Sequence, residues 1–117
     1  MSYELDITWR HMDPSPHLEG EIRERVEALS RFHTHIERFT VTIEQPPHHQ
    51  AHGGAWHVMI RIALPGPDIV VSRDPGDDKT HNDVYAAVRD AFAAAKKLLI
   101  KRSDTTSGQQ RRHEARG

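Results

Sequence analysis

The residues of this chain best placed to do chemistry are basic, and they gather in the segment 82–102. That segment holds five basic and two acidic side chains, a local charge of +3, in a chain whose formal net charge is −1. Lys97 and Lys101 lie four positions apart. Arg89 and Lys96 lie seven apart, so on a helix each pair forms one strip. Two cationic strips at helical pitch suit successive phosphates of a folded RNA. The predicted chemistry is the binding of a phosphate-rich surface, with a merely solvated face as the alternative.

Two further clusters were weighed as metal sites. Histidines at short spacings can hold zinc, and four of them fall within 48–57: His48, His49, His52 and His57. No cysteine or carboxylate completes that set, so a polar loop is the favoured interpretation. An acidic stretch at 74–83 could hold a cation, but acidic residues also favour a helix start. Its members are Asp74, Asp77, Asp78, His81 and Asp83. We predict no metal and no cofactor.

The chain lacks the motifs of known catalytic sites. It has no Gly-rich phosphate loop, no nucleophile elbow and no paired-carboxylate motif. We therefore predict a protein that is not an enzyme and has no small-molecule substrate. Tyr85 could stack on a base, but its ring is expected to flank the core with the hydroxyl at the rim. Trp9 and Trp56 are expected in the core.

Length and composition bound the class of protein. A chain of 117 residues allows one domain with one modest core. With 36% hydrophobic and 28% charged residues it is typical of a soluble globular protein. It has no cysteine, no basic-then-apolar leader and no apolar run of the roughly 20 residues that span a bilayer. We expect a cytoplasmic protein with no membrane partner.

Hydrophobic periodicity predicts an α+β domain with the order β-α-β-β-β-α. The strands are expected at 3–9, 38–45, 56–64 and 68–73, and the helices at 16–33 and 82–102. Both helices must cover one face of a four-stranded sheet, because each has one apolar stripe to bury. The other sheet face is expected to be solvated and carries Thr40, Thr42, His57 and Arg61. The domain should span 1–102, with a disordered polar tail at 103–117.

The apolar stripes of the two helices give the expected core. In the helix 16–33 the stripe is Leu18, Ile22, Val26, Leu29 and Phe32. In the helix 82–102 it is Val84, Val88, Ala91, Ala95, Leu98 and Leu99. Ser15 should cap the first helix and Pro16 should occupy its first position. Asn82 or Asp83 should cap the second.

Several short motifs, in order, match one family. Residues 7–11, Ile-Thr-Trp-Arg-His, correspond to a family opening Ile-Thr-Gly-Arg-His. Ser15 then starts a helix with Leu18 three residues on, and residues 29–32, Leu-Ser-Arg-Phe, fit the family's Leu-x-Arg-Phe. Residues 83–88, Asp-Val-Tyr-Ala-Ala-Val, correspond to Asp-Met-Tyr-Ala-Ala-Ile. Through these motifs the chain resembles the short ribosome hibernation factors: the hibernation promoting factor and ribosome-associated inhibitor A family, or sigma-54 modulation proteins.

This resemblance covers about residues 5–102 and implies both fold and function. The family fold is β-α-β-β-β-α and is related to the double-stranded-RNA-binding domain. Its members bind the small ribosomal subunit between head and body, where they block messenger and transfer RNA. The resemblance implies that basic residues on both helices contact ribosomal RNA. The RNA-binding residues expected here are Arg25, Arg31, Arg89, Lys96, Lys97, Lys101 and Arg102.

We therefore expect a ribosome-associated translation inhibitor or hibernation factor, acting under stress as a monomer or weak homodimer. The alternative is a diverged protein-interaction or regulatory module with the same fold and weak or no ribosome binding. That alternative is motivated by the helix 16–33, which holds three arginines against four glutamates. In the helix 82–102, Ala94 also stands where the family usually has a lysine.

Overall fold

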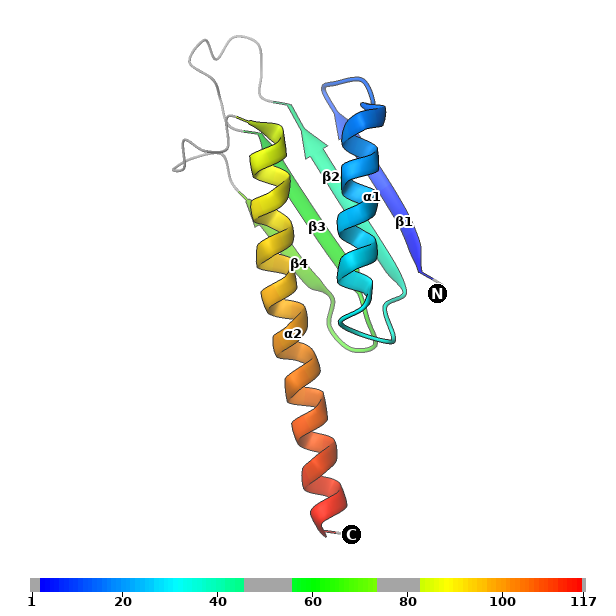
Figure 1. Cartoon of the computed structure of the whole chain (residues 1–117), viewed down its shortest axis with the longest axis vertical. Helices are drawn as coiled ribbons and strands as arrows, with labels where there is room; N and C mark the ends of the chain where they lie inside the picture. Colours follow the sequence, from blue (N-terminus) through cyan, green and yellow to red (C-terminus); the bar gives the residue numbers. More distant parts are fainter. Residues whose placement is uncertain (1–2, 46–55, 74–82, 117) are drawn as a thin grey trace.

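The computed structural model describes residues 3–45, 56–73 and 83–116 (Figure 1). Its elements are β1 (Glu4–Arg10), α1 (Pro16–Ser30), β2 (Arg38–Glu44), β3 (His57–Ala63), β4 (Ile69–Arg73) and α2 (Val84–Arg116). This order confirms the predicted β-α-β-β-β-α arrangement and the α+β class. The expected strand boundaries differ from the observed ones by one residue at most.

The four strands form one mixed sheet in the order β1-β2-β3-β4. β2, β3 and β4 are antiparallel neighbours, as expected for a meander, whereas β1 runs parallel to β2. β1 and β2 can be parallel because α1 lies between them in the sequence. This helix returns the chain to the end of the sheet at which β1 begins. The register brings apolar residues into rows across the sheet. One such row is Ile7, Val41, Ile60 and Val71.

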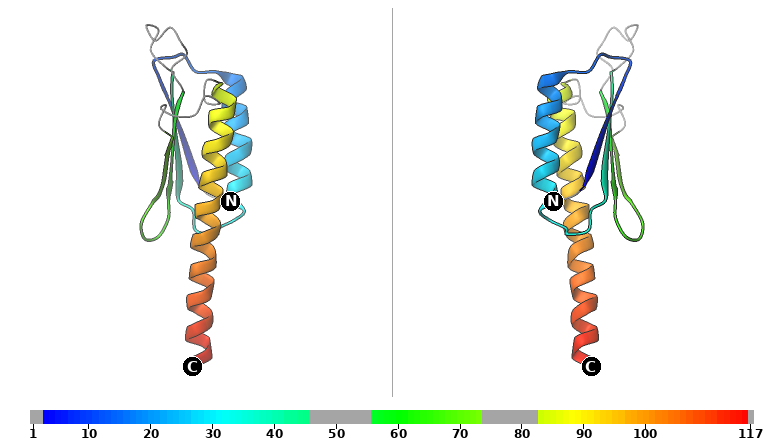
Figure 2. Two further views of the ribbon diagram at one scale, coloured as in Figure 1. Left: turned by 90° about the vertical axis from the view of Figure 1, so that its left-hand side faces the viewer. Right: turned by 90° about the vertical axis from the view of Figure 1, so that its right-hand side faces the viewer.

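Both helices pack on the same face of this sheet, as the two side views in Figure 2 show. α1 begins as predicted, because the Ser15 side chain accepts a hydrogen bond from the Leu18 N–H at 3.2 Å and Pro16 occupies the first helical position. The core lies between helices and sheet. α1 contributes Leu18, Ile22, Val26 and Leu29, and α2 contributes Ala87, Val88, Ala91, Phe92, Ala95 and Leu99. The predicted stripes are thus largely confirmed.

Three side chains differ from their expected burial. Phe32 is 38% exposed, because α1 ends at Ser30 and the helical period no longer applies two residues later. Leu98 is 43% exposed, since it lies on the side of α2 that overhangs β4, the last strand of the sheet. Thr42, expected on a solvated face, is buried between the neighbouring strands.

The second helix is longer than predicted. α2 continues to Arg116 and extends beyond the sheet (Figure 1). No proline interrupts this stretch, so the backbone can keep its helical hydrogen bonds. Ser103, just after the predicted domain end, donates its hydroxyl to the Phe32 carbonyl oxygen at 2.8 Å. The division into a domain at 1–102 and a disordered polar tail at 103–117 stays a prediction.

Candidate nucleic-acid interface

The outward faces of α1 and α2 lie side by side in front of the sheet (Figure 1). A groove of about 260 Å³ opens between them. It is lined by Arg25, Ala28, Leu29 and Phe32 from the α1 side and by Arg89, Phe92, Ala93 and Lys96 from α2. We call this the inter-helix groove. It combines an apolar floor with cations from both helices.

The inter-helix groove brings together three of the residues predicted to bind RNA. Arg25 reaches it from α1, and its Nη2 donates to Glu21 Oε1 at 3.0 Å. The Arg25 Nε is buried without a hydrogen-bond partner. Arg89 comes from α2 and lies 3.6 Å from the Asp90 carboxylate through its Nε. An anion that entered the groove would therefore meet guanidinium groups from both helices.

Lys96 and Phe32 meet across this groove. The Lys96 Nζ lies 5.1 Å from the centroid of the Phe32 ring, which is the geometry of a cation–π contact. Lys96 was predicted as a site residue, but Phe32 was assigned to the core. The sequence signals for Phe32 were its place at the end of the helical stripe and in the motif at 29–32, and both also fit burial.

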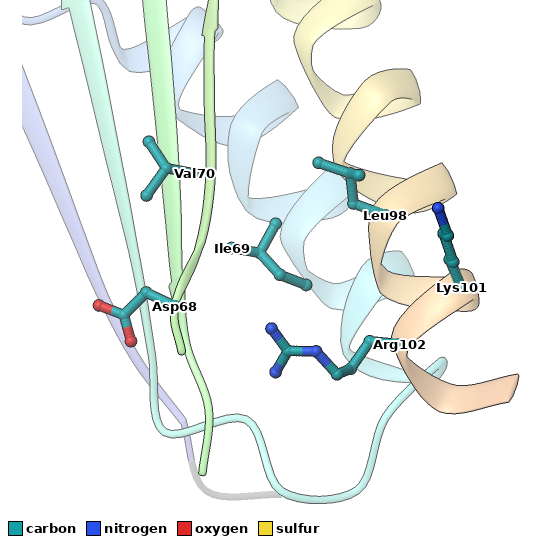
Figure 3. Close-up of a pocket in the computed structure, with 6 residues that line it drawn as sticks. All are labelled: Asp68, Ile69, Val70, Leu98, Lys101 and Arg102. Atoms are coloured by element: carbon teal, nitrogen blue, oxygen red, sulfur yellow. The ribbon is translucent and has the colours of Figure 1, made fainter. Parts of the chain in front are cut away.

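Lys101 and Arg102 form a second basic cluster, further along α2. They line a cavity of about 380 Å³ with Asp68, Ile69, Val70 and Leu98, between α2 and β4 (Figure 3). Arg102 Nη2 donates to the Pro67 carbonyl oxygen at 2.8 Å, so this side chain also ties α2 to the β3–β4 turn. Of the two predicted strips, Arg89 and Lys96 thus share the inter-helix groove, whereas Lys101 lines this second cavity without Lys97.

Arg31 and Lys97, the two remaining predicted residues, line neither of these cavities. Both are exposed. Arg31 is the C-cap residue of α1, whereas Lys97 lies one turn before Lys101 on α2, as predicted from their spacing. The structure thus places all seven predicted residues on the helical side, in α1, its cap or α2.

The charge of α1 is largely satisfied within that helix. Arg23 pairs with Glu19 at 3.5 Å and Arg25 with Glu21 at 3.0 Å, both one turn apart. Glu24 is exposed as well. Each of these arginines therefore meets a carboxylate of its own helix, which lowers the positive potential of α1.

The opposite sheet face carries ion pairs rather than a basic patch. Arg38 bridges Glu4 and Asp6, the latter at 2.9 Å. Arg61 lies 3.9 Å from Asp68. These arginines of the sheet face thus have carboxylate neighbours, and the basic surface belongs to the helical side.

His33 lies at the end of α1, close to α2. Burial lowers its pKa below the ordinary 6.5, and the charges of His35 and Arg102 lower this pKa further. These causes favour the neutral form of the imidazole just beyond the end of α1.

The described residues include only part of the two clusters that were weighed as metal sites. Within residues 3–45, 56–73 and 83–116, no group of three or more histidine, aspartate or glutamate side chains could hold a metal ion. Most members of the two suspected clusters lie outside these residues: His48, His49, His52, Asp74, Asp77, Asp78 and His81. Asp83 caps α2, because its carboxylate accepts a hydrogen bond from the Tyr85 N–H at 3.0 Å.

The three aromatic residues weighed as base-stacking candidates lie largely as expected. The Tyr85 ring is half-exposed and packs edge-on against His17, with 5.8 Å between ring centroids. Trp9 and Trp56 are partly buried against the core. None of the three lines the inter-helix groove. In the part of the chain that is described, no helix has the length and apolarity to cross a membrane.

Comparison with known proteins places this geometry in a family. The family model described as Sigma 54 modulation protein / S30EA ribosomal protein matches residues 5–107. The match includes every element of the sheet, both helical faces and all seven predicted site residues. No curated protein matches the chain in sequence.

Solved structures confirm the fold. The crystal structure of the N-terminal domain of Thermus thermophilus Protein Y is similar at a TM-score of 0.63 and 19% identity, with 85% of this chain and 94% of that one covered. A ribosomal subunit interface protein from Coxiella burnetii is similar at a TM-score of 0.66 and 17% identity, covering 86% and 98%. At such identities the likeness is one of fold.

Proposed function

The chain belongs to the family of Sigma 54 modulation proteins and S30EA ribosomal proteins, and from this premise we propose that it inhibits translation by binding ribosomal RNA of the small subunit. This family consists of ribosome-associated factors rather than enzymes, in agreement with the sequence analysis. In the proposed function the protein works in the cytoplasm and stabilises idle ribosomes under stress. The helical side is the docking face.

The observation that carries the proposal is the position of the basic residues. Arg89, Lys96, Lys97, Lys101 and Arg102 all lie on α2. Arg25 and Arg31 add to them from α1 and its cap. This one-sided distribution on a chain of nearly neutral net charge favours one docking face for a polyanion. The subunit interface protein from Coxiella burnetii, which shares the fold, supports the ribosome as that polyanion.

Binding through these residues requires a characteristic salt response. Each lysine or arginine that neutralises a phosphate releases condensed counterions, so the affinity falls as salt rises. The ion pair of Arg89 does not oppose docking strongly, because surface pairs contribute only about 0–1 kcal/mol. A phosphate can therefore replace the Asp90 carboxylate as the partner of Arg89.

Co-sedimentation with purified small ribosomal subunits at low and high salt tests the proposal. The wild-type chain should pellet with the subunits at low salt and be released at high salt. The double variant Lys97→Glu/Lys101→Glu should stay in the supernatant under both conditions. Arg10→Glu/Arg61→Glu, which changes the net charge equally on the opposite face, should pellet like wild type.

Two results would contradict this function. The wild-type protein could remain in the supernatant at low salt, or the two double variants could behave alike. In the second case only the net charge would matter, and no docking face would exist. Circular dichroism of both variants controls for folding.

A second candidate function is a protein-interaction or regulatory module that kept the fold. The ion pairs of Arg23 and Arg25 with α1 glutamates favour it, because they reduce the positive charge of half the helical side. A pulldown after RNase treatment separates the two candidates. One protein partner, retained without ribosomal proteins, would support the module and exclude the ribosomal function.

A further inference from the structure

Phe32 is an exposed aromatic residue whose backbone is held in place. Its N–H donates to the Leu29 carbonyl oxygen at 3.0 Å, and its own carbonyl oxygen accepts from the Ser103 hydroxyl at 2.8 Å. The backbone is thus tied to both α1 and α2, yet the residue remains 38% exposed. Because the residue stays this exposed, packing within the domain accounts for little of its placement.

The inter-helix groove beside Phe32 has room for a small planar group. Ala28 and Ala93 line it with methyl groups, and buried Phe92 closes its floor. Its volume of about 260 Å³ is below the roughly 300–1,000 Å³ of pockets for drug-sized ligands. The groove therefore suits something the size of one ring system rather than a whole metabolite.

Positive groups surround this apolar space. Arg25 lines the groove from α1, whereas Arg89 and Lys96 line it from α2. A ligand that fits must combine a flat apolar face with nearby negative charge. A nucleotide of single-stranded RNA does so, since each base has a stacking face and is flanked by phosphates.

We propose that the inter-helix groove takes one unstacked base of RNA, stacked on the Phe32 ring, with the adjoining phosphates on Arg25, Arg89 and Lys96. This inference rests on the proposed RNA-binding function and adds a base contact to it. Phe32 is then a binding residue that contacts only a base that has left its stack. The lysines further along α2 contact phosphates alone.

Lys96 gives way when the base arrives. Its contact with the Phe32 ring is worth about a twofold to fivefold factor at an exposed site. Stacking of a base on an aromatic side chain is worth about 5-fold to 150-fold. The base therefore displaces the ammonium group from the ring, and the flexible lysine is free to reach the neighbouring phosphate.

The test measures the binding of two short single-stranded probes to the full chain. One probe is an oligoadenylate, and the other is an abasic ribose-phosphate oligomer of equal length. Phe32→Leu keeps an apolar side chain but removes the ring face. It should weaken oligoadenylate binding about 5-fold to 150-fold, with an unchanged salt slope, and leave abasic binding as in wild type. Phe32→Tyr should bind like wild type.

Tyr85→Leu is the matched control, because it also removes a ring. Tyr85 is similarly exposed, at 39%, but lines neither cavity, so its replacement should change neither affinity. Equal oligoadenylate binding by wild type and Phe32→Leu overturns the inference, as does no preference for the oligoadenylate over the abasic probe. Capture of an RNase-resistant protein partner that is lost in Phe32→Leu also overturns it, because the groove would then hold a peptide.

The failures of the two proposals are distinguishable. If Phe32→Leu binds subunits normally while Lys97→Glu/Lys101→Glu does not, the proposed function stands and the base contact falls. If the wild-type chain binds neither subunits nor the oligoadenylate, both fall. Thermal unfolding of each variant confirms that the fold is kept.

Discussion

α1 and α2 are alike toward the sheet and different toward solvent. Both bury leucine, valine or alanine at helical spacing against the same sheet face. Outside, α1 pairs Arg23 and Arg25 with glutamates one turn away. α2 instead presents Lys96 toward the inter-helix groove and Lys97 on a neighbouring strip, with Lys101 one turn on from Lys97. The two helices therefore both build the core, but they differ in the charge that they present to solvent.

This difference indicates that α2 supplies most of the positive charge, whereas α1 mainly shapes the inter-helix groove. The cations that can reach phosphates lie mainly on α2. α1 contributes one wall of the inter-helix groove, with Arg25 beside it and Phe32 at its end. A loss of positive charge on α1 is therefore compatible with RNA binding, as long as α1 still positions that groove.

The largest expected effect tests the likeness of the inner faces. Leu18→Ala in α1 and Leu99→Ala in α2 each remove a buried side chain that is at most 1% exposed. Each should lower the free energy of unfolding by about 2–5 kcal/mol, through lost burial and a new cavity. Denaturant titration measures both. A loss of stability in only one of the two variants would show that the buried faces of α1 and α2 do not contribute alike.

The next largest effect concerns the helix caps. Each cap should contribute about 1 kcal/mol to the free energy of unfolding. Ser15→Ala leaves the Leu18 N–H without its partner, and Asp83→Ala does the same to the Tyr85 N–H. Both variants should lose stability by that amount. The loss in Asp83→Ala should shrink with added salt, because its carboxylate also interacts with the helix dipole. Asp83→Asn should keep the salt-independent share, and an equal salt response of the Ser15 variant would argue against this account.

A smaller effect tests the outer faces directly. Glu24→Gln/Glu27→Gln removes two exposed acidic groups from α1. The affinity for small subunits should rise about twofold to fivefold, the size of a weak surface interaction. Asp6→Asn/Glu44→Gln removes equal charge from the opposite sheet face and serves as the control. A rise of equal size in the control would show that α1 has no special place near the RNA.

The smallest effect sharpens the comparison where the helices meet. The pKa of His33 is lowered by burial, by His35 and by Arg102, so folding favours its neutral form. Its contribution to stability should be complete above the ordinary pKa of 6.5 and be lost as the pH falls through that value toward the lowered pKa. Unfolding of wild type and His33→Gln at about pH 5 and about pH 8 measures it. His33→Gln should be the less pH-dependent protein, and identical profiles would contradict the argument.

Local patterns in the sequence were enough for most of the fold. Alternation at Phe39, Val41 and Ile43 gave the face of β2, and Ser15 followed by Pro16 gave the start of α1. These features depend on neighbours within a few positions, where propensity and capping act. Thr42 departs from alternation because cross-strand neighbours cover it, and only the finished sheet supplies those.

The candidate site could be predicted only as a set of charges. The spacing of Lys97 and Lys101 fixed their common strip on α2. The meeting of Arg25 with Arg89 depends on how two helices pack, for which the sequence has no local signal. Phe32 was missed because periodicity assigns every apolar residue to a stripe and does not report that α1 ends at Ser30.

The central claim is that α2, not α1 or the opposite sheet face, lies nearest the ribosomal RNA. Because the chain has no cysteine, single cysteines can carry a tethered iron probe that cleaves nearby RNA. Ala94→Cys, at a residue that lines neither cavity, reports from α2, Glu24→Cys from α1 and Ser72→Cys from the sheet face. On small subunits, we predict strong cleavage from position 94, weaker cleavage from 24 and none from 72. Cleavage strongest from position 72, or equal from all three, would contradict the account.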